Sequence, residues 1–242
     1  EADAAWARAG SPHAGLAVLG GIALDERSRA AAREMVADRD RTEFLPDDPL
    51  AFVDTQLSSL TDAPIRAGFN VRSATPGPIA DVAGVCADHG AVCEVNAHCR
   101  QDELCTVGCG ESLLRETDRL ADYVARAADA GAVVGVKVRT EVPGVDLVAV
   151  CRAIEDAGAA YVHVDAMDSE AVVADVAAAT DLFVVANNGV RDRETAWEYL
   201  DHGADAVSVG RPSDDPAVLA RVADAVAEWV AEQEAGTVGV EP

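Results

Sequence analysis

Residues 133–166 read VVGVKVRTEVPGVDLVAVCRAIEDAGAAYVHVDA, and this stretch decides the fold. It begins with a valine-rich run, continues with an amphipathic helical pattern closed by Ala-Gly, and ends with a second valine-rich run. Two short apolar runs joined by one helix are typical of a parallel β–α–β unit. The stretch therefore predicts strands at 133–139 and 160–166, with a helix over 145–158 between them.

The same unit recurs along the 242-residue chain, so that strands and helices alternate eight times. Eight units of this length match a (β/α)8 barrel. We predict a single-domain α/β protein with the (β/α)8 TIM-barrel fold over residues 1–230, followed by a flexible C-terminal tail over 231–242. An open doubly wound sheet is the alternative. The predicted strands are 14–21, 42–45, 66–72, 91–97, 133–139, 160–166, 182–189 and 205–211.

Composition bears on the class of protein and its partners. Half of the residues are hydrophobic, the formal net charge is −24, and Lys137 is the only lysine. Such an acidic surface stays hydrated when salt screens its charges, and it is typical of proteins from salt-loving archaea. No apolar run approaches the ~18 residues of a membrane span, and the N-terminus has no signal-peptide pattern. We expect a cytoplasmic protein with no membrane partner, and the charge argues only softly against an RNA partner.

Polar side chains interrupt the predicted strands at every second position, so that each set points to one face of its strand. They lie near the C-terminal ends of the strands, which form the active-site mouth of a barrel. Burying such groups unpaired is costly, so the pattern predicts a ligand site. A hydrogen-bonded polar network without a ligand is the alternative. The residues are Asn70, Arg72, Glu94, Asn96, His98, Lys137, Arg139, His163 and Asp165.

Lys137 is informative because the composition has eliminated lysine everywhere else. An ammonium in the middle of a strand suits an anionic or carbonyl-rich ligand, since propensity and burial both disfavour lysine there. The alternative is a buried ion pair with Glu94 or Asp165.

Two later strands end in motifs that suit a phosphate group. The first strand ends in Asn188-Gly189 and the second in Gly210-Arg211. These are the seventh and eighth predicted strands, whose loops often bind phosphate in barrels through glycine N–H groups. The arginine could add a forked charge-assisted contact.

Three of the six cysteines, Cys99, Cys105 and Cys109, follow the strand at 91–97. Their spacing is not a standard zinc or iron–sulfur pattern, which leaves metal ligation as a weak alternative. All three could be small packing residues. Cys99 could instead be a proton donor or nucleophile, because it stands at the predicted mouth.

The ordered motifs resemble those of the dihydrouridine synthases, FMN-dependent TIM barrels that reduce uridine in tRNA. The motifs are VNAHCRQ…VGCGESLL, VKVR, VHVD, ANNGV and SVGR. The agreement runs from Asn70 to Arg211 and is closest to a short archaeal subgroup. The resemblance implies FMN as cofactor, NADPH or NADH as reductant, and reduction of the C5–C6 bond of uridine.

The resemblance also implies roles for particular residues. Cys99 stands at the general acid of the family, although the family usually has Gly-Cys-Pro where this chain has His98-Cys99-Arg100. The residues that match cofactor-binding positions are Asn70, Asn96, Lys137, His163, Asn188, Gly189, Gly210 and Arg211. No metal site is implied.

Other functions stay open from the sequence. The family's C-terminal helical domain, which grips tRNA, has no counterpart after the last predicted helix, so a small pyrimidine or enone substrate is an alternative to tRNA. A barrel that binds a phosphorylated ligand or a partner protein without catalysis is a third possibility.

Overall fold

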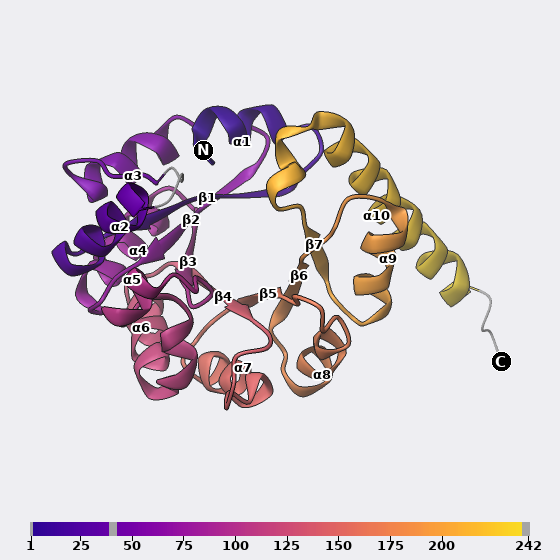
Figure 1. Cartoon of the computed structure of the whole chain (residues 1–242). Helices are drawn as coiled ribbons and strands as arrows, with labels where there is room; N and C mark the ends of the chain where they lie inside the picture. The colour runs from indigo at the N-terminus through magenta and orange to yellow at the C-terminus, as the bar shows by residue number, and fades with distance from the viewer. Residues whose placement is uncertain (1, 39–42, 239–242) are drawn as a thin grey trace.

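Seven strands form one parallel sheet, and their order in the sheet follows their order in the chain (Figure 1). The structure is a computed structural model that describes residues 2–38 and 43–238. A doubly wound sheet reverses its strand order at a switch point, so the described strands exclude that alternative. The strands are β1 (Leu16–Ala23), β2 (Arg66–Arg72), β3 (Val92–Asn96), β4 (Val133–Arg139), β5 (Tyr161–Asp165), β6 (Phe183–Asn187) and β7 (Ala206–Ser208).

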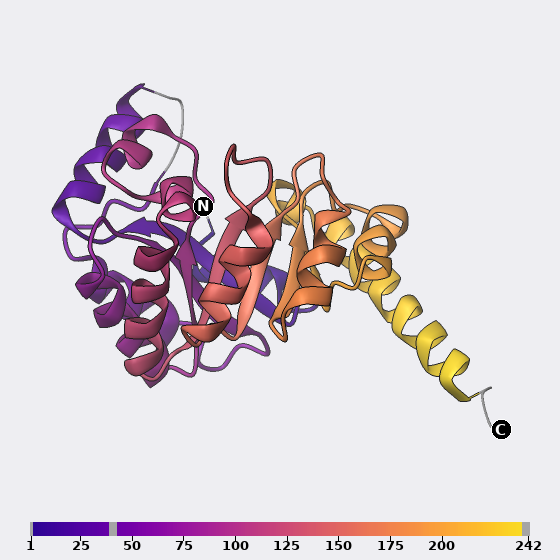
Figure 2. The same ribbon diagram turned by 90° about the horizontal axis from the view of Figure 1, so that it is seen from below.

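Helices lie outside the sheet and alternate with the strands (Figure 1). Helices α2 and α5 pack against each other above the C-terminal ends of the strands, where they build up one side of the mouth (Figure 2). The α-helices are α1 (Ala4–Gly10), α2 (Glu26–Asp38), α3 (Pro49–Ser58), α4 (Gly77–Asp88), α5 (Asp102–Thr106), α6 (Thr117–Asp129), α7 (Leu147–Asp156), α8 (Val172–Ala179), α9 (Arg193–Asp201) and α10 (Pro216–Val238). The 3-10 helices are η1 (Gly110–Arg115) and η2 (Arg211–Asp214).

The sheet curls toward a barrel, but strand pairing does not close it. Figure 1 shows β1 to β7 around a ring with the helices outside. Over residues 2–38 and 43–238, β7 does not pair with β1. Helix α1 contacts β1, η2 and α10 on that side of the ring. The prediction of an α/β fold with a parallel, barrel-like sheet is confirmed, whereas the described strands number seven instead of eight.

The predicted strand at 42–45 is the one that does not join the sheet. Thr42 lies outside the described residues, and Phe44 makes only an isolated parallel bridge with Ile22. Pro46 follows at once and lacks the N–H that would extend a ladder. Phe44 packs on Phe52 with ring centroids 5.0 Å apart, and β1 pairs directly with β2.

The C-terminal segment also differs from its prediction. Helix α10 extends to Val238, so residues 231–238 are helical where a loose tail was expected. The run AEQEA in this part is rich in strong helix formers. Figure 2 shows the end of α10 projecting from the rest of the protein. Residues 239–242 lie outside the described part of the chain.

The helices of the described segments include none that is both long and apolar enough to cross a bilayer.

The two faces of β4 differ in what they contact, since one face packs into the hydrophobic core and the other faces the inside of the sheet. Val134, Val136 and Val138 are buried in the main hydrophobic cluster. Gly135 alternates with them and leaves room for an aromatic ring of β5. A Cβ atom at Gly135 would lie 2.0 Å from Cζ of Tyr161. Only glycine therefore lets this tyrosine lie across the inner face of β4.

We expect Gly135→Ala to destabilise the protein, because the new methyl group would overlap the Tyr161 ring. Overpacking of this kind lowers the free energy of unfolding by about 1–3 kcal/mol. Gly84→Ala in α4 is the matched control, since a Cβ there meets nothing within 4 Å and alanine favours a helix. Thermal unfolding followed by circular dichroism should show a lower Tm for the first variant only. Equal Tm values would contradict the packing assigned to Tyr161.

Candidate active site

Polar side chains of β2, β3 and β5 form one buried hydrogen-bonded network around Glu94. Asn70 Nδ2 donates to Glu94 Oε1 at 2.7 Å, and Asn96 Nδ2 donates to Asn70 Oδ1 at 2.7 Å. On the other side, His163 Nδ1 lies 3.0 Å from Glu94 Oε2, and the Tyr161 hydroxyl donates to the same oxygen at 3.3 Å. The Glu94 carboxylate is therefore the centre of the network, although no role was predicted for it beyond its place on the inner face.

Glu94 keeps its charge although its relative accessibility is only 1%. Burial raises the pKa of this carboxyl, but His163, Lys137 and Asn70 lower it more, to about 2. Burial and Lys137 lower the pKa of His163, against the opposing effect of Glu94, so we assign a neutral imidazole. Its Nδ1–H then donates to Glu94, which leaves Nε2 as an acceptor. That Nε2 atom is buried and has no hydrogen-bond partner among the described residues.

Lys137 lies between two members of this network. It pairs in register with Asn96 of β3 and with His163 of β5. The alternative of an ion pair with Glu94 or Asp165 is wrong, because those carboxylates pair with His163 and His98 respectively. No hydrogen bond or ion pair within the described segments engages the Lys137 ammonium, which leaves it available to a ligand.

Cys99 is fixed at the end of β3 by its backbone. Asn96 Oδ1 accepts hydrogen bonds from the N–H groups of His98 at 3.1 Å and of Cys99 at 3.0 Å. The N–H of Glu111 donates to the Cys99 carbonyl at 2.8 Å. Gly110 allows this approach, because it has a φ of +64° and a Cβ there would lie 2.1 Å from that carbonyl oxygen. The Asn96 side chain thus connects the Glu94 network to the loop that carries the thiol.

The other two cysteines of this segment are packing residues. Cys105 Sγ donates to the Cys99 carbonyl at 3.5 Å, and Cys109 is buried beside Met35 and Leu104. Burial raises the pKa of both thiols, that of Cys109 to about 12. The described residues contain no group of His, Cys, Asp or Glu side chains that could hold a metal ion.

The Cys99 thiol lies beside positive charge. Burial raises its pKa, but the Arg72 guanidinium and His98 lower it more, against an opposing effect of Glu43, so that the pKa is about 7. Arg72 Nη1 lies 3.6 Å from Cys99 Sγ, and Nη2 donates to Glu43. Arg72 itself is buried at the end of β2. Neither Arg72 nor Glu43 was predicted as a site residue, and only the placement of Arg72 on the same face as Asn70 pointed to it.

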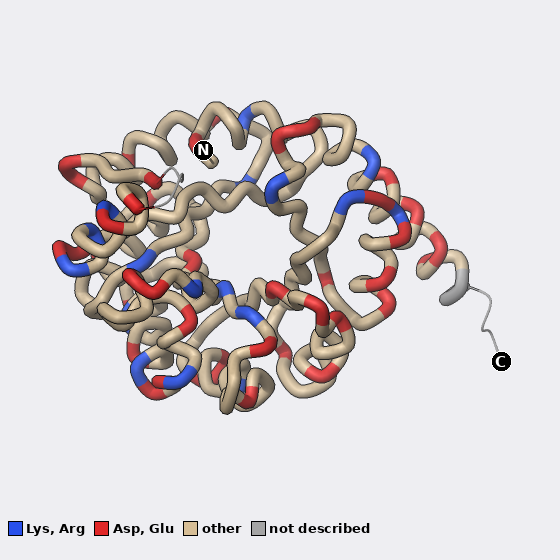
Figure 3. The backbone as a smooth tube through the Cα atoms, viewed as in Figure 1, with Lys and Arg blue, Asp and Glu red and all other residues tan. Residues whose placement is uncertain are grey.

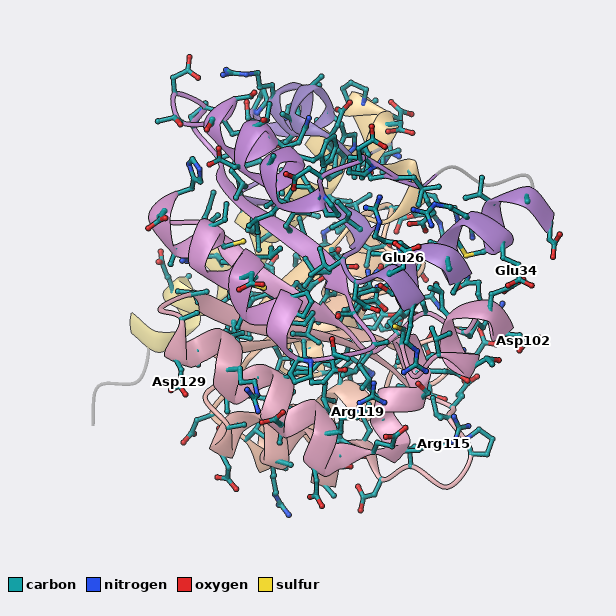
Figure 4. All side chains as sticks on the ribbon, turned by 90° about the vertical axis from the view of Figure 1, so that its left-hand side faces the viewer. Glu26, Glu34, Asp102, Arg115, Arg119 and Asp129 are labelled. Atoms are coloured by element: carbon teal, nitrogen blue, oxygen red, sulfur yellow. The ribbon has the colours of Figure 1, made fainter. Side chains whose placement is uncertain are left out.

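The loop after β2, which follows Arg72, is braced from two sides. Arg119 Nη2 on α6 donates to the Ala74 carbonyl at 2.8 Å (Figure 4). The Asp25 carboxylate accepts from Ser73 Oγ at 2.7 Å and from the Ala74 N–H at 2.6 Å. These contacts hold the end of β2 against the start of α2 and of α6, which limits how far Arg72 can move from the thiol.

His98 and the rim of β4 carry two further ion pairs. His98 Nε2 lies 2.5 Å from Asp165 Oδ2, and burial lowers the pKa of His98 less than Asp165 and Cys99 raise it. Arg139 Nη1 donates to Glu111 Oε2 at 2.8 Å. The Nε atoms of Arg72 and Arg139 are buried without a partner among the described residues.

The predicted phosphate loops lie at the ends of β6 and β7. Asn188 and Gly189 have φ values of 116° and 68°, and Asn188 Nδ2 donates to the Met167 carbonyl at 2.6 Å. A Cβ atom at Gly210 would lie 3.7 Å from Oδ1 of Asn187, so the two loops are neighbours. Arg211 begins η2 and is exposed, with no hydrogen bond or ion pair to any described residue.

The fold and site together define a class of protein, namely a parallel β/α protein with a polar site at the C-terminal ends of its strands. The sequence profile of the family "Dihydrouridine synthase (Dus)" matches residues 34–238, and the chain belongs to this family. The family depends on FMN in general, and membership implies an oxidoreductase that acts on CH–CH bonds.

Individual relatives are distant. An uncharacterized protein of Methanocaldococcus jannaschii is 25% identical over 81% of this chain and 79% of its own length. Among solved structures, a candidate lyase/mutase of Burkholderia cenocepacia gives a TM-score of 0.56 at 17% identity, over 98% of this chain and 80% of its own. A FabK mutant of Thermotoga maritima gives 0.55 at 17% identity, over 86% of this chain and 57% of its own. These structures are similar to this chain in fold.

We expect Glu94→Gln to reduce stability in a pH-dependent way. The folded-state pKa of Glu94, about 2, lies below its ordinary value of 4.5. The stabilisation from ionised Glu94 is therefore fully present above pH 4.5 and is lost as the pH falls toward 2. At pH 7 the variant should lose about 1–3 kcal/mol of unfolding free energy.

Urea unfolding at several pH values tests this expectation. The difference between wild type and variant should shrink below pH 4.5. Glu34→Gln, on the exposed side of α2, is the control and should show no such difference (Figure 4). A pH-independent difference for Glu94→Gln would show that its charge is not what the network stabilises.

Proposed function

We propose that the chain is an FMN-dependent oxidoreductase that reduces the C5–C6 bond of uridine, with NADPH or NADH as the source of electrons. The observation that carries the proposal is the position of Cys99. Its thiol stands at the end of β3, where Asn96 fixes the Cys99 backbone. In this part of the site Lys137 and Nε2 of His163 have no hydrogen-bond partner among the residues that the structure describes. Family membership supports the same reaction type.

The residues present fit FMN. The cofactor is a dianion with a ring that carries both donors and acceptors, so it needs cations and unpaired polar groups. Lys137 and His163 Nε2 supply them at the centre of the site. Gly189 and Gly210, with Arg211, would hold the phosphate, as would the backbone of Asn188. On the β1 side a Cβ at Gly21 would lie 2.8 Å from Asn70 Oδ1 and 3.1 Å from Arg72 Nη2, so glycine there lets these two side chains lie against β1.

Asn70 and Asn96 support the site in a different manner. Both amides are engaged within the protein, Asn70 by Glu94 and Asn96 by the Cys99 loop. We assign them the task of orienting Glu94 and Cys99 beside the cofactor.

The chemistry divides between cofactor and protein. FMN, when bound and reduced, supplies the hydride that is added to C6 of the uracil ring. Cys99 supplies the proton that is added to C5, so that its S–H bond breaks and a thiolate remains. Lys137 contributes positive charge next to the electron-rich atoms of the ligands. The polar network holds these groups in place without a change in its own charge.

A small pyrimidine is the second candidate substrate, and the charge distribution favours it. Figure 3 shows Asp and Glu along the outer helices around the whole ring, whereas several Lys and Arg residues lie at the inner rim beside β3 and β4. With a net charge of −24, the outer surface repels a polyanion such as tRNA at low salt. A mononucleoside has no such chain of phosphates to bring near the surface.

We expect Lys137→Ala to weaken FMN binding. Loss of a charge-assisted contact of about 1.5–3 kcal/mol corresponds to a roughly 10- to 100-fold higher Kd. Titration of apoprotein with FMN, followed by flavin fluorescence, measures it. Arg126→Ala is the matched control, because Arg126 pairs with Asp122 on the exposed face of α6. An unchanged Kd for Lys137→Ala would count against the assigned role, and a wild type that binds no FMN would refute the cofactor.

We expect Cys99→Ala to separate the two half-reactions. Reduction of bound FMN by NADPH needs no proton from the thiol and should keep its rate. Oxidation by a uridine substrate should slow about 10²- to 10⁴-fold, and Cys105→Ala should change neither rate. Stopped-flow absorbance near 450 nm follows both steps, with unmodified tRNA and free pyrimidines assayed in parallel. Turnover of neither substrate class by wild type would leave the ligand-binding barrel as the better description.

A further inference from the structure

We propose that His98 and Asp165 form a proton relay that returns a proton from solvent to Cys99 after each turnover, while Arg72 holds the thiolate in the interval. The catalytic meaning of this relay rests on the proposed function, in which Cys99 gives up a proton. The arrangement itself is a property of this chain and can be tested without substrate.

The geometry places His98 between a carboxylate and the thiol. Its Nε2 atom lies 2.5 Å from Asp165 Oδ2, which leaves Nδ1 as the ring nitrogen without that partner. Cys99 follows His98 directly in the chain, and each of the two side chains shifts the pKa of the other. Asp165 is the last residue of β5, and its other oxygen accepts the Met167 N–H at 3.2 Å. The single Oδ1 atom of Asn96 fixes the backbone of both His98 and Cys99. The imidazole of His98 is therefore bound to the carboxylate of Asp165, and Asn96 holds the backbone of His98 and of Cys99 in place.

Solvent can supply the proton at His98, which is the middle member of the three and more exposed than Asp165. The His98 side chain has a relative accessibility of 29%, whereas that of Asp165 has 15%. When Cys99 protonates C5, the S–H bond breaks, a C–H bond forms and a thiolate is left. The imidazolium Nδ1–H then gives its proton to sulfur, and the neutral ring takes up another from water. Asp165 stays ionised and stabilises the imidazolium, so no oxidant or reductant enters the step.

Two different residues stabilise the Cys99 thiolate and return its proton. The Arg72 guanidinium, 3.6 Å away, stabilises the thiolate but cannot lose a proton in this pH range. His98 is the neighbour whose ring can both take up and release a proton, and its pKa is raised above its ordinary value. The opposing charges are Glu43 on the far side of Arg72, and Lys137 of β4, which acts on His98. Cys105 of α5 and Cys109 and Glu111 of the η1 segment complete the surroundings, and the pKa values of these two thiols are raised.

The first experiment measures the titration of the thiol in the purified protein. The rate of Cys99 alkylation by iodoacetamide is followed from pH 5 to 10, with each cysteine resolved by peptide mass spectrometry. Wild type should give an apparent pKa of about 7. His98→Gln and Asp165→Asn should each raise it by about one unit, which lowers the thiolate fraction at pH 7 several-fold.

The sign of the Asp165→Asn effect is decisive. If Asp165 acted on Cys99 only by its own charge, its removal would favour the thiolate and lower the pKa. A rise is expected only if Asp165 acts by keeping His98 protonated. His89→Gln is the matched control, because His89 forms a similar pair with Asp54 at 2.7 Å on the surface. A Cys99 pKa that is unchanged or lower in Asp165→Asn overturns the relay.

The second experiment compares the first turnover with later ones. At pH 6 most Cys99 thiols of the reduced holoenzyme are protonated at the start, because their pKa is about 7. The rate of flavin oxidation in the first turnover of His98→Gly should therefore lie within about twofold of the wild-type rate. Later turnovers with NADPH should slow about tenfold or more, and added imidazole should restore them. Arg72→Gln should affect all turnovers alike, since a guanidinium passes on no proton.

The outcomes separate the relay from the proposed function. Equal slowing of first and later turnovers in His98→Gly, without rescue by imidazole, overturns the relay. If wild type turns over no uridine substrate at all, the proposed function fails. The alkylation profiles still decide whether His98 and Asp165 control protonation of Cys99, with thermal melting as the check that each variant is folded.

Discussion

A buried carboxylate is the constraint on which the site depends. Glu94 is almost fully enclosed, and an unpaired charge in such surroundings would cost several kcal/mol. Its two oxygens are satisfied by Asn70 from β2 and by His163 and Tyr161 from β5. These partners come from strands on both sides of β3, so the register of the sheet and the charge of Glu94 support each other. The bond from His163 Nδ1 also determines which nitrogen of that ring remains free.

Asn96 connects this centre to the chemistry at the rim. Its amide nitrogen donates to Asn70, and its amide oxygen accepts from the backbone of His98 and Cys99. One side chain thus gives the reactive loop a fixed position relative to the Glu94 network. A loop held this firmly can support a thiol with a pKa of about 7, because Arg72 and His98 lower the pKa of Cys99 more than burial raises it. Flexible placement would let solvent screen both charges.

Much of the fold follows from period and length in the sequence. The strands at 66–72 and 133–139 match their predicted bounds, because their alternating apolar and polar residues fit a sheet with one polar face. Short elements are harder to predict. Helix α1 and helix α5 were missed because they have seven and five residues, too few for a 3.6-residue period to be visible. The segment 42–45 has a strand-like composition, but tertiary contacts of Phe44 and the following Pro46 decide its conformation.

The strand face on which the polar side chains lie could be predicted from the sequence, but the pairs that these side chains form could not. Alternation along the strands predicted that Glu94, Lys137 and His163 share the inner face. The hydrogen bond between His163 and Glu94 and the pairing of Lys137 with His163 agree with this placement. Which carboxylate pairs with which cation depends on the register between strands, and a single sequence does not contain that information. The ion pair that was the alternative role for Lys137 is absent from the described residues, where His163 and His98 pair with the two carboxylates.

The distribution of charge explains how an acidic protein can hold an anionic ligand. The net charge of −24 is carried by side chains on the outer helices, where water and ions screen it. Lys137, a cation of the inner face with no ion pair to the residues that the structure describes, lies in surroundings where screening is weak and a single charge acts strongly. Recognition of a phosphate or a flavin ring therefore depends more on nearby groups such as Lys137 and Arg211 than on the electrostatic potential of the net charge. A macromolecular substrate, in contrast, would have to approach through the negative potential of the outer helices. Binding of a large polyanionic substrate should therefore require a higher ionic strength than binding of a small one.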